Sequence, residues 1–165
     1  MAEKTALKTY RDKRNFDATP EPAEGGEANE HARSFVVQKH WATRLHYDFR
    51  LELEGTMKSW AVPKGPSYDP HDKRMAMPTE DHPIAYNKFE GTIPAGNYGA
   101  GKVIIWDKGT WIPLEDPHKG YRDGKLKFEL LQTGDGESWH PISPAQLPDA
   151  IPRHRVPDAS ATPGR

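Results

Sequence analysis

The sequence predicts an all-β fold, a small closed β-barrel with a short N-terminal arm that carries a helical turn. Residues 44–53 and 125–131 alternate between apolar and polar side chains, which is the two-residue period of a half-buried strand. Other short apolar runs are separated by glycine and proline, and the one helix-like stretch is a turn at residues 4–10. Several short strands joined by such turns are typical of a barrel or a sandwich.

Composition divides the chain into three regions. Residues 1–33 are polar, and residues 20–30 (PEPAEGGEANE) have almost nothing to bury, so we expect a flexible N-terminal arm. Residues 34–140 carry the apolar alternation and are expected to form the β-barrel domain. Six prolines recur between positions 141 and 163 with few large apolar residues, so residues 141–165 are expected to form a disordered tail.

A first hairpin is predicted near the start of this domain. The alternating run at residues 44–53 is followed by Glu54, Gly55 and a second apolar run at residues 57–62. Two residues of this type between two such runs are typical of a tight turn, so we expect the runs to pair as antiparallel strands.

A second hairpin and a last strand are predicted further along the chain. Residues 102–106 and 110–112 flank Asp107-Lys108-Gly109, where Gly109 is expected to supply a positive φ. The run at residues 125–131 is expected to form a strand that buries three apolar side chains: Leu126, Phe128 and Leu130.

The overall composition excludes several classes of protein. The chain has 165 residues, enough for one domain, and it has no cysteine, which excludes a disulfide framework and a thiolate metal site. No apolar run is long enough to span a bilayer, and no signal peptide is recognisable. We therefore expect a cytoplasmic, nucleoid-associated monomer. The net charge of −1 means that any contact with nucleic acid must come from a local cluster.

The polar face of residues 44–53 carries the main candidate site. His46 and Asp48 lie two residues apart on one face, with Cβ atoms roughly 6–7 Å apart, and Arg50 continues the row. His40 could join them if the chain doubles back. Two imidazoles and a carboxylate leave open positions on a metal for substrate, and Arg50 is suited to bind a phosphate. The competing interpretation is an ordinary solvated strand face.

Two further positions are candidates for phosphate chemistry. His82 and Tyr86, in the segment EDHPIAY at residues 80–86, could supply proton transfer and hydrogen bonds to a phosphate, or could belong to a polar loop. Lys64 follows a predicted strand in a rigid turn where a cation can be aimed. The glycine-rich segment at residues 91–101 lacks the Gly-Lys-Ser/Thr ending of a P-loop, so it is interpreted as turns between strands.

Six motifs together resemble the 3′-phosphoesterase domain of bacterial DNA ligase D, over about residues 7–131. The motifs occur in the order and spacing of that family. They are FVVQKH (35–40), RLHYDFRLE (44–52), SWAVPKGP (59–66), EDHP (80–83), FEG (89–91) and YGAG (98–101).

The resemblance implies a compact β-barrel with one manganese ion bound by His40, His46 and Asp48. It implies that Arg50 and His82 engage the scissile phosphate and that Tyr86 and Lys64 line the same site as catalytic residues. Four more positions match residues that bind the substrate: Arg14, Asn15, Glu21 and Gln38. The implied activity trims a 3′-terminal ribonucleotide and removes a 3′-phosphate from DNA or RNA-tailed DNA, leaving a 3′-OH end for non-homologous end joining.

The sequence departs from the family pattern at two places. Asn15 stands where the family has an aspartate that supports phosphodiester cleavage, so we expect a bias toward removal of the 3′-phosphate. The usual C-terminal strands are reduced to a degraded segment at residues 136–142. We expect no attached polymerase or ligase domain. We therefore expect a stand-alone version that meets a ligase, a polymerase and Ku in trans.

Two other functions are compatible with parts of this pattern. Two histidines and one carboxylate also fit the metal triad of iron oxygenases, although those enzymes use a larger jelly roll. The second rival is a DNA-end-binding or recruitment module that has kept the fold and lost its chemistry. Retention of all three predicted metal ligands and His82 favours the enzyme.

Overall fold

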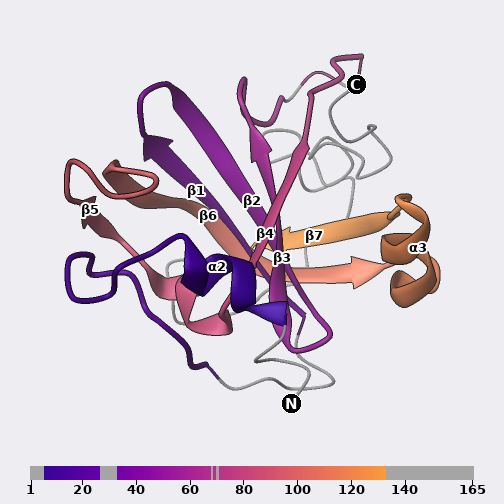
Figure 1. Ribbon diagram of the computed structural model, residues 1–165. Coiled ribbons are helices and arrows are strands. Elements are labelled where there is room, and N and C mark those ends of the chain that lie inside the picture. Colours follow the sequence, from indigo (N-terminus) through magenta and orange to yellow (C-terminus); the bar gives the residue numbers. More distant parts are fainter. Residues whose placement is uncertain (1–5, 27–32, 68, 70, 133–165) are drawn as a thin grey trace.

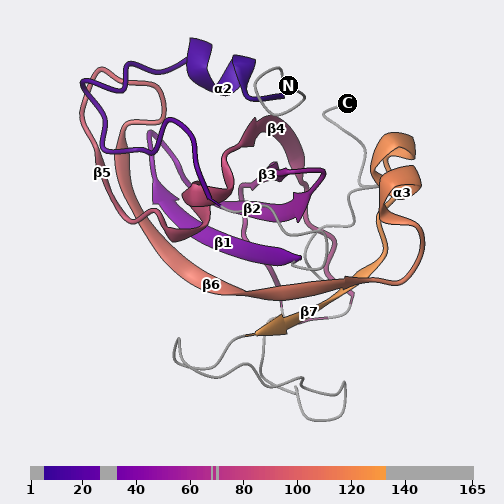
Figure 2. The ribbon, with the colours of Figure 1, turned by 90° about the horizontal axis from the view of Figure 1, so that it is seen from below.

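The computed structural model contains one antiparallel sheet that curls into a half-barrel (Figures 1 and 2). It describes residues 6–26, 33–67, 69 and 71–132. The helical elements are α2 (Lys8–Asp12), the 3-10 helix η1 (Ile84–Lys88) and α3 (Pro117–Asp123). The strands are β1 (Ser34–Trp41), β2 (Leu45–Leu53), β3 (Thr56–Val62), β4 (Met77–His82), β5 (Gly91–Ile93), β6 (Gly101–Pro113) and β7 (Phe128–Gln132).

The strand order confirms the all-β class and corrects the expected closure. The order is β4-β3-β2-β1-β6-β5, and β7 pairs with the far end of β6. Within the described residues β4 and β5 end the sheet without pairing with each other, so the barrel stays open on that side. In Figure 2 this open side is where α2 lies. None of the described helices is long and apolar enough to cross a lipid bilayer.

The first predicted hairpin is confirmed. Strands β2 and β3 pair in register from Tyr47↔Val62 to Leu53↔Thr56, which leaves Glu54 and Gly55 as the loop. Their φ angles are 56° and 81°. A two-residue loop with both angles positive matches the right-handed twist of the strands, and glycine adopts such angles without steric cost.

The second predicted hairpin is wrong, because β6 runs straight through Asp107-Lys108-Gly109. Its pairing with β1 shifts register between Val37 and Gln38, so Trp106 is an extra residue at a bulge. Gly109 does not have a positive φ. It is required for another reason, since an added Cβ would collide with the carbonyl oxygen of Leu131 on β7.

Replacing Gly109 with alanine is therefore expected to destabilise the protein by about 2 kcal/mol, because the β6–β7 pair must separate to admit a methyl group. Urea unfolding followed by tryptophan fluorescence measures the change. Thr92→Ala on the exposed surface of β5 is the control and should unfold within about 0.5 kcal/mol of the unchanged protein. Equal stability of Gly109→Ala and the control would contradict the close approach of the two strands.

The two faces of the sheet are packed by two apolar clusters. The larger one includes the three apolar side chains predicted for residues 125–131, which confirms their burial. Its members are Phe35, Val37, Phe49, Leu51, Leu53, Trp60, Val62, Ala76, Trp111, Leu126, Phe128 and Leu130. The smaller cluster lies on the face that carries His40 and Asp48. Its members are Tyr10, Tyr86, Phe89, Ile93 and Val103.

The smaller cluster ties the N-terminal segment to the sheet. Leu7 and Tyr10 have no exposed surface, and Tyr10 contacts the rings of His82 and Tyr86. Residues 6–26 of the predicted arm are therefore placed beside the candidate site. The predicted tail at residues 141–165 and the degraded motif at residues 136–142 lie outside the described residues.

Helix α3 is an element that the sequence analysis missed. The Asp116 carboxylate accepts hydrogen bonds from the amides of His118 and Lys119, Pro117 occupies the first turn, and Gly124 ends the helix with a φ of 74°. An Asp-Pro start with a glycine eight residues later is a recognisable pattern of helix ends. The signal was present, but the helix is too short to show a periodicity.

Candidate metal centre and phosphate pocket

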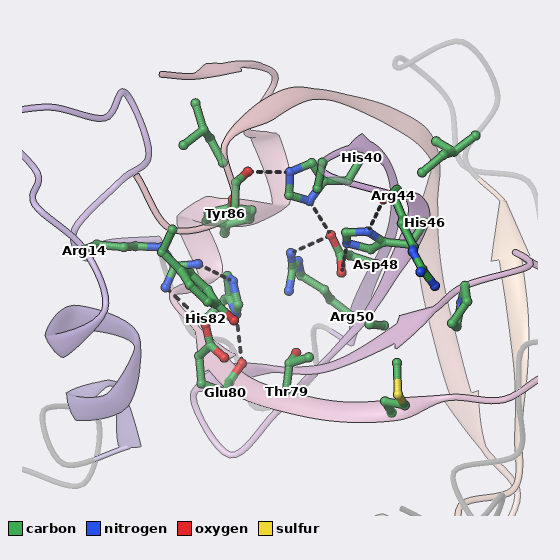
Figure 3. A pocket seen from close by; sticks show the side chains of 18 residues that line it. Arg14, His40, Arg44, His46, Asp48, Arg50, Thr79, Glu80, His82 and Tyr86 are labelled. Atoms are coloured by element: carbon green, nitrogen blue, oxygen red, sulfur yellow. Dashed lines mark hydrogen bonds and ion pairs between the residues drawn. The ribbon is translucent and has the colours of Figure 1, made fainter. Parts of the chain in front are cut away.

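Three predicted metal ligands come together on the paired strands β1 and β2. His40 lies directly opposite His46 in the pairing of β1 with β2, and Asp48 is two residues further along β2 on the same face. One ligand atom from each of the three side chains lies within 4.8 Å of the others. Figure 3 shows the two imidazoles and the carboxylate pointing toward one another on one side of the pocket.

The backbone fixes which nitrogen of each histidine faces this cluster. His40 Nε2 lies 2.6 Å from the carbonyl oxygen of Gly99, and His46 Nδ1 lies 3.1 Å from that of Arg44. Since a carbonyl only accepts, these outer nitrogens carry the protons. The inner nitrogens, His40 Nδ1 and His46 Nε2, lie 3.2 and 3.3 Å from the oxygens of Asp48. Ligating histidines in metal sites use this same outer hydrogen bond, so the donor set fits a divalent cation.

The charges of the cluster agree with this arrangement. Burial alone would raise the pKa of the Asp48 carboxyl, but hydrogen bonds from His40 and His46, whose inner nitrogens donate when the rings are protonated, and the charge of Arg50 hold that pKa far below its usual value. The hydrogen bond to Asp48 in turn raises the pKa of His46, against the effect of burial. Asp48 is therefore an anion that calls for a positive partner, which a metal ion or protonated imidazoles can supply.

Arg50 lies next to the ligands with part of its guanidinium unpaired. Its Nε donates to Gln38 Oε1 at 2.8 Å, its Nη2 lies 3.7 Å from Asp48 Oδ2, and its guanidinium carbon lies 4.7 Å from the centre of the Tyr86 ring. Nη1 is buried and has no hydrogen-bond partner among the described residues. A buried cationic donor without an acceptor is unusual, and a phosphate oxygen would satisfy it.

His82 faces the same pocket in its neutral form. Its Nδ1 donates to the carbonyl oxygen of Glu80 at 2.8 Å, so its Nε2 is the acceptor and lies 3.3 Å from Arg14 Nη2. Burial, together with the positive charges of Arg50 and Arg14, lowers the pKa of His82 well below its usual value. A neutral imidazole flanked by two guanidinium groups can accept a proton from a reacting group.

Arg14 is held by two carboxylates from different parts of the chain. Its Nε donates to Glu21 at 2.9 Å and its Nη1 donates to Glu80 at 3.1 Å. The hydroxyl of Tyr86 donates to the same Glu21 oxygen at 2.7 Å. The side chain of Glu21 is completely buried, so the structure places it behind Arg14 and Tyr86, where it orients both.

Gln38 also lies behind the pocket, at zero exposure. Its amide nitrogen donates to the carbonyl oxygens of Tyr86 and Phe89, and its oxygen accepts from Arg50. Glu21 and Gln38 were predicted to bind substrate. In this geometry they do not line the cavity themselves. They position the side chains that do: Glu21 positions Arg14 and Tyr86, and Gln38 positions Arg50.

One cavity of about 630 Å³ brings the site together. Seven of the predicted site residues line it: Arg14, His40, His46, Asp48, Arg50, His82 and Tyr86. Asn15 and Lys64 are exposed and do not line it, and the Asn15 side-chain oxygen accepts from the Asp17 amide. Sequence reasoning missed Arg44 and Tyr98, whose only signal was their position inside two of the recognised motifs.

Comparison with known proteins places most of the sheet in one family. Residues 38–140 match the DNA ligase D 3′-phosphoesterase domain. The multifunctional non-homologous end joining protein LigD of Pseudomonas aeruginosa is 52% identical over 149 residues, covering 86% of this chain and 17% of the relative. The non-homologous end joining DNA repair protein LigD of Mycobacterium tuberculosis is 43% identical over 144 residues, covering 81% and 19%. That of Mycolicibacterium smegmatis is 48% identical over 152 residues, covering 81% and 20%.

The chain thus spans about a fifth or less of the length of these relatives. The matched segment contains the metal-ligand candidates, Arg50 and His82. This chain belongs to the DNA ligase D 3′-phosphoesterase domain family.

Proposed function

We propose that the chain is a metal-dependent phosphoesterase that removes phosphate from DNA 3′ ends and leaves a 3′-OH for non-homologous end joining. The observation that carries this proposal is the unpaired Arg50 Nη1 beside three convergent metal ligands in one cavity. A cation and an unsatisfied guanidinium side by side form a receptor for a phosphoryl group, whose oxygens accept from both.

Manganese is the proposed ion, one per chain, because the resemblance to the ligase D phosphoesterase family implies it, and a donor set of nitrogen and oxygen without a thiolate is compatible with it. When bound, a divalent ion supplies Lewis-acid polarisation of a phosphoryl oxygen. Arg50 binds a second oxygen of the same group and offsets the charge that develops on it. His82 Nε2, kept unprotonated by its surroundings, would take a proton from the attacking water as the bond from phosphorus to the 3′-oxygen breaks, and that leaving oxygen takes up a proton to become the 3′-OH. The hydrogen bond from His82 Nδ1 to the Glu80 carbonyl oxygen keeps that imidazole in position, and Nε2 is free for this step once the substrate draws Arg14 Nη2 away from it.

The proposal favours phosphate removal over trimming of a 3′-ribonucleotide. Asn15 stands at the position of the family's aspartate, and its side chain is exposed and engaged with the Asp17 amide. The metal ligands and Arg50, which both reactions would need, are complete. We therefore propose a monoesterase with weaker phosphodiesterase activity. Its product end is the kind that a ligase or polymerase uses, and such enzymes, with Ku, are the proposed partners.

The iron-oxygenase alternative shares the metal donors but not the rest of the pocket. Redox chemistry on a small oxo-acid does not call for two buried arginines and a neutral histidine facing the metal ligands. The guanidinium groups of Arg14 and Arg50, which line the cavity with the metal ligands, support an oxyanion substrate.

The test uses a labelled primer–template that ends in a 3′-phosphate or in a single 3′-ribonucleotide. With manganese, the 3′-phosphate is expected to be removed at least about tenfold faster than the ribonucleotide, and chelator should abolish both reactions. Gel electrophoresis separates the products. Equal rates on the two ends would contradict the monoesterase bias. DNA binding without any change to either end would instead identify an end-binding module.

A further inference from the structure

One end of the cavity, beyond His46, has an apolar surface that the proposed chemistry does not use. We call it the apolar shelf, and its members are Leu45, Ala61, Pro63 and Met77. Ala61 lies beside Asp48 in the pairing of β2 with β3, and Met77 lies beside Ala61 in the pairing of β3 with β4. Ala61 and Met77 therefore continue the row of Asp48 across the sheet. Leu45 is 44% exposed and Met77 is 38% exposed, so it is open to a ligand.

The basic residues are distributed unevenly between the two ends of the cavity. At the end opposite the shelf, Arg14 is paired with Glu21 and Glu80, and Lys13 is paired with Glu80. At the shelf end, Arg44 lines the cavity with an exposed side chain. No hydrogen bond or ion pair joins its guanidinium to another residue in the described part of the chain, and only its carbonyl is engaged, by His46.

We propose that the apolar shelf and Arg44 bind the primer-strand nucleotide that carries the reacting 3′-phosphate. The sugar and base lie on the shelf, and Arg44 binds the phosphodiester on the 5′ side of that nucleotide. This rests on the proposed function, because it takes the reacting phosphate to lie between the metal ligands and Arg50.

Charge decides which end of the cavity receives the DNA strand. The strand continues away from the reacting phosphate as a polyanion, so it is attracted to an unpaired cation. The opposite end is neutralised by Glu21 and Glu80 and offers it no such attraction. An exposed apolar surface beside the unpaired cation also suits the face of a base, since stacking and apolar contact bind bases of any sequence. The neutralised end then receives the terminal nucleoside, which is the leaving group in phosphodiester cleavage.

Arg44→Gln tests the phosphate contact, and Lys125→Gln, which removes an exposed lysine in the loop after α3, is the matched control. Binding of a fluorescent single strand with an unreactive 3′-OH end is measured by anisotropy over a range of salt concentrations. Arg44→Gln should bind about fivefold more weakly and lower the slope of log K against log salt by about one unit. The control should keep both values. An unchanged salt slope in Arg44→Gln would overturn the proposal.

A second comparison isolates the position of the contact along the strand. Thymidine 3′,5′-bisphosphate carries the 5′-phosphate that Arg44 would bind, and thymidine 3′-phosphate lacks it. The bisphosphate should have the lower KM with the unchanged protein, and Arg44→Gln should remove that advantage.

The apolar shelf is tested with a 3′-phosphate end whose last nucleotide is abasic. The unchanged protein should prefer the normal end over the abasic one, and Met77→Gln should remove that preference.

The two proposals fail in different ways. If the protein hydrolyses none of these substrates, the proposed function fails, while the anisotropy measurement still tests the shelf. If hydrolysis is normal and Arg44→Gln keeps the bisphosphate advantage, the shelf proposal alone fails.

Discussion

Replacing Asp48 with asparagine is expected to lower kcat/KM for removal of a 3′-phosphate by about a thousandfold. The substitution keeps the size and shape of a side chain that is almost fully buried between His40 and His46. It removes the one negative charge of the ligand set. It also replaces one carboxylate oxygen, which accepts, with an amide nitrogen, which donates. The site then presents two neutral imidazoles and no anion, which is a poor receptor for a divalent cation.

Isothermal titration with manganese separates this effect from a loss of fold. Asp48→Asn should show no saturable binding in the micromolar range, whereas Asp123→Asn should bind as the unchanged protein does. Asp123 is a suitable control because it is exposed on α3 and pairs only with its neighbours Lys119 and Arg122 among the described residues. Retention of metal binding and activity by Asp48→Asn would exclude it as a ligand.

Strand periodicity predicts part of the metal-ligand cluster but not all of it. Alternation in β2 placed His46 and Asp48 on one face, because every second side chain of a strand shares a face. It could not place His40, since that requires the register of β1 against β2. The register pairs His40 with His46 directly, and it depends on the β1–β2 loop and on both apolar cores. That information is not local to either strand.

The two main misses have related causes. A strand of thirteen residues with a bulge resembles two strands and a turn, because Asp-Lys-Gly is good turn chemistry wherever it occurs. Only its partners β1 and β7 keep β6 extended. Likewise, a polar arm with Arg14 and Glu21 gives no local sign of burial. Both side chains are buried because Glu80 and Tyr86, over sixty residues away, complete their hydrogen bonds.

His82 is expected to make the metal-free protein lose about 1.6 kcal/mol of stability as the pH falls from 6.5 to 5.0. Burial and two neighbouring arginines keep its folded-state pKa well below the value of about 6.5 that it has in an unfolded chain. Below pH 6.5 the unfolded chain therefore takes up a proton that the folded protein does not. Proton uptake by the unfolded state alone favours unfolding, so stability rises with pH in this window.

The other shifted groups of the pocket act outside this window, which makes the measurement specific. His46 has a raised folded-state pKa, so its contribution to the stability is complete below pH 6.5 and is lost only as the pH rises through that pKa. Asp48 and Glu80 have lowered folded-state pKa values. Their contribution to the stability is lost only as the pH falls below about 4.5.

Urea unfolding at half-unit steps of pH, with chelator present, gives the slope for the unchanged protein and for His82→Asn. The variant loses a buried ring, which lowers its absolute stability, so only the slope is compared between the two proteins. Removing this buried neutral imidazole should flatten the curve between pH 5.0 and 6.5. If both proteins lose stability equally over that range, His82 is not the group that resists protonation.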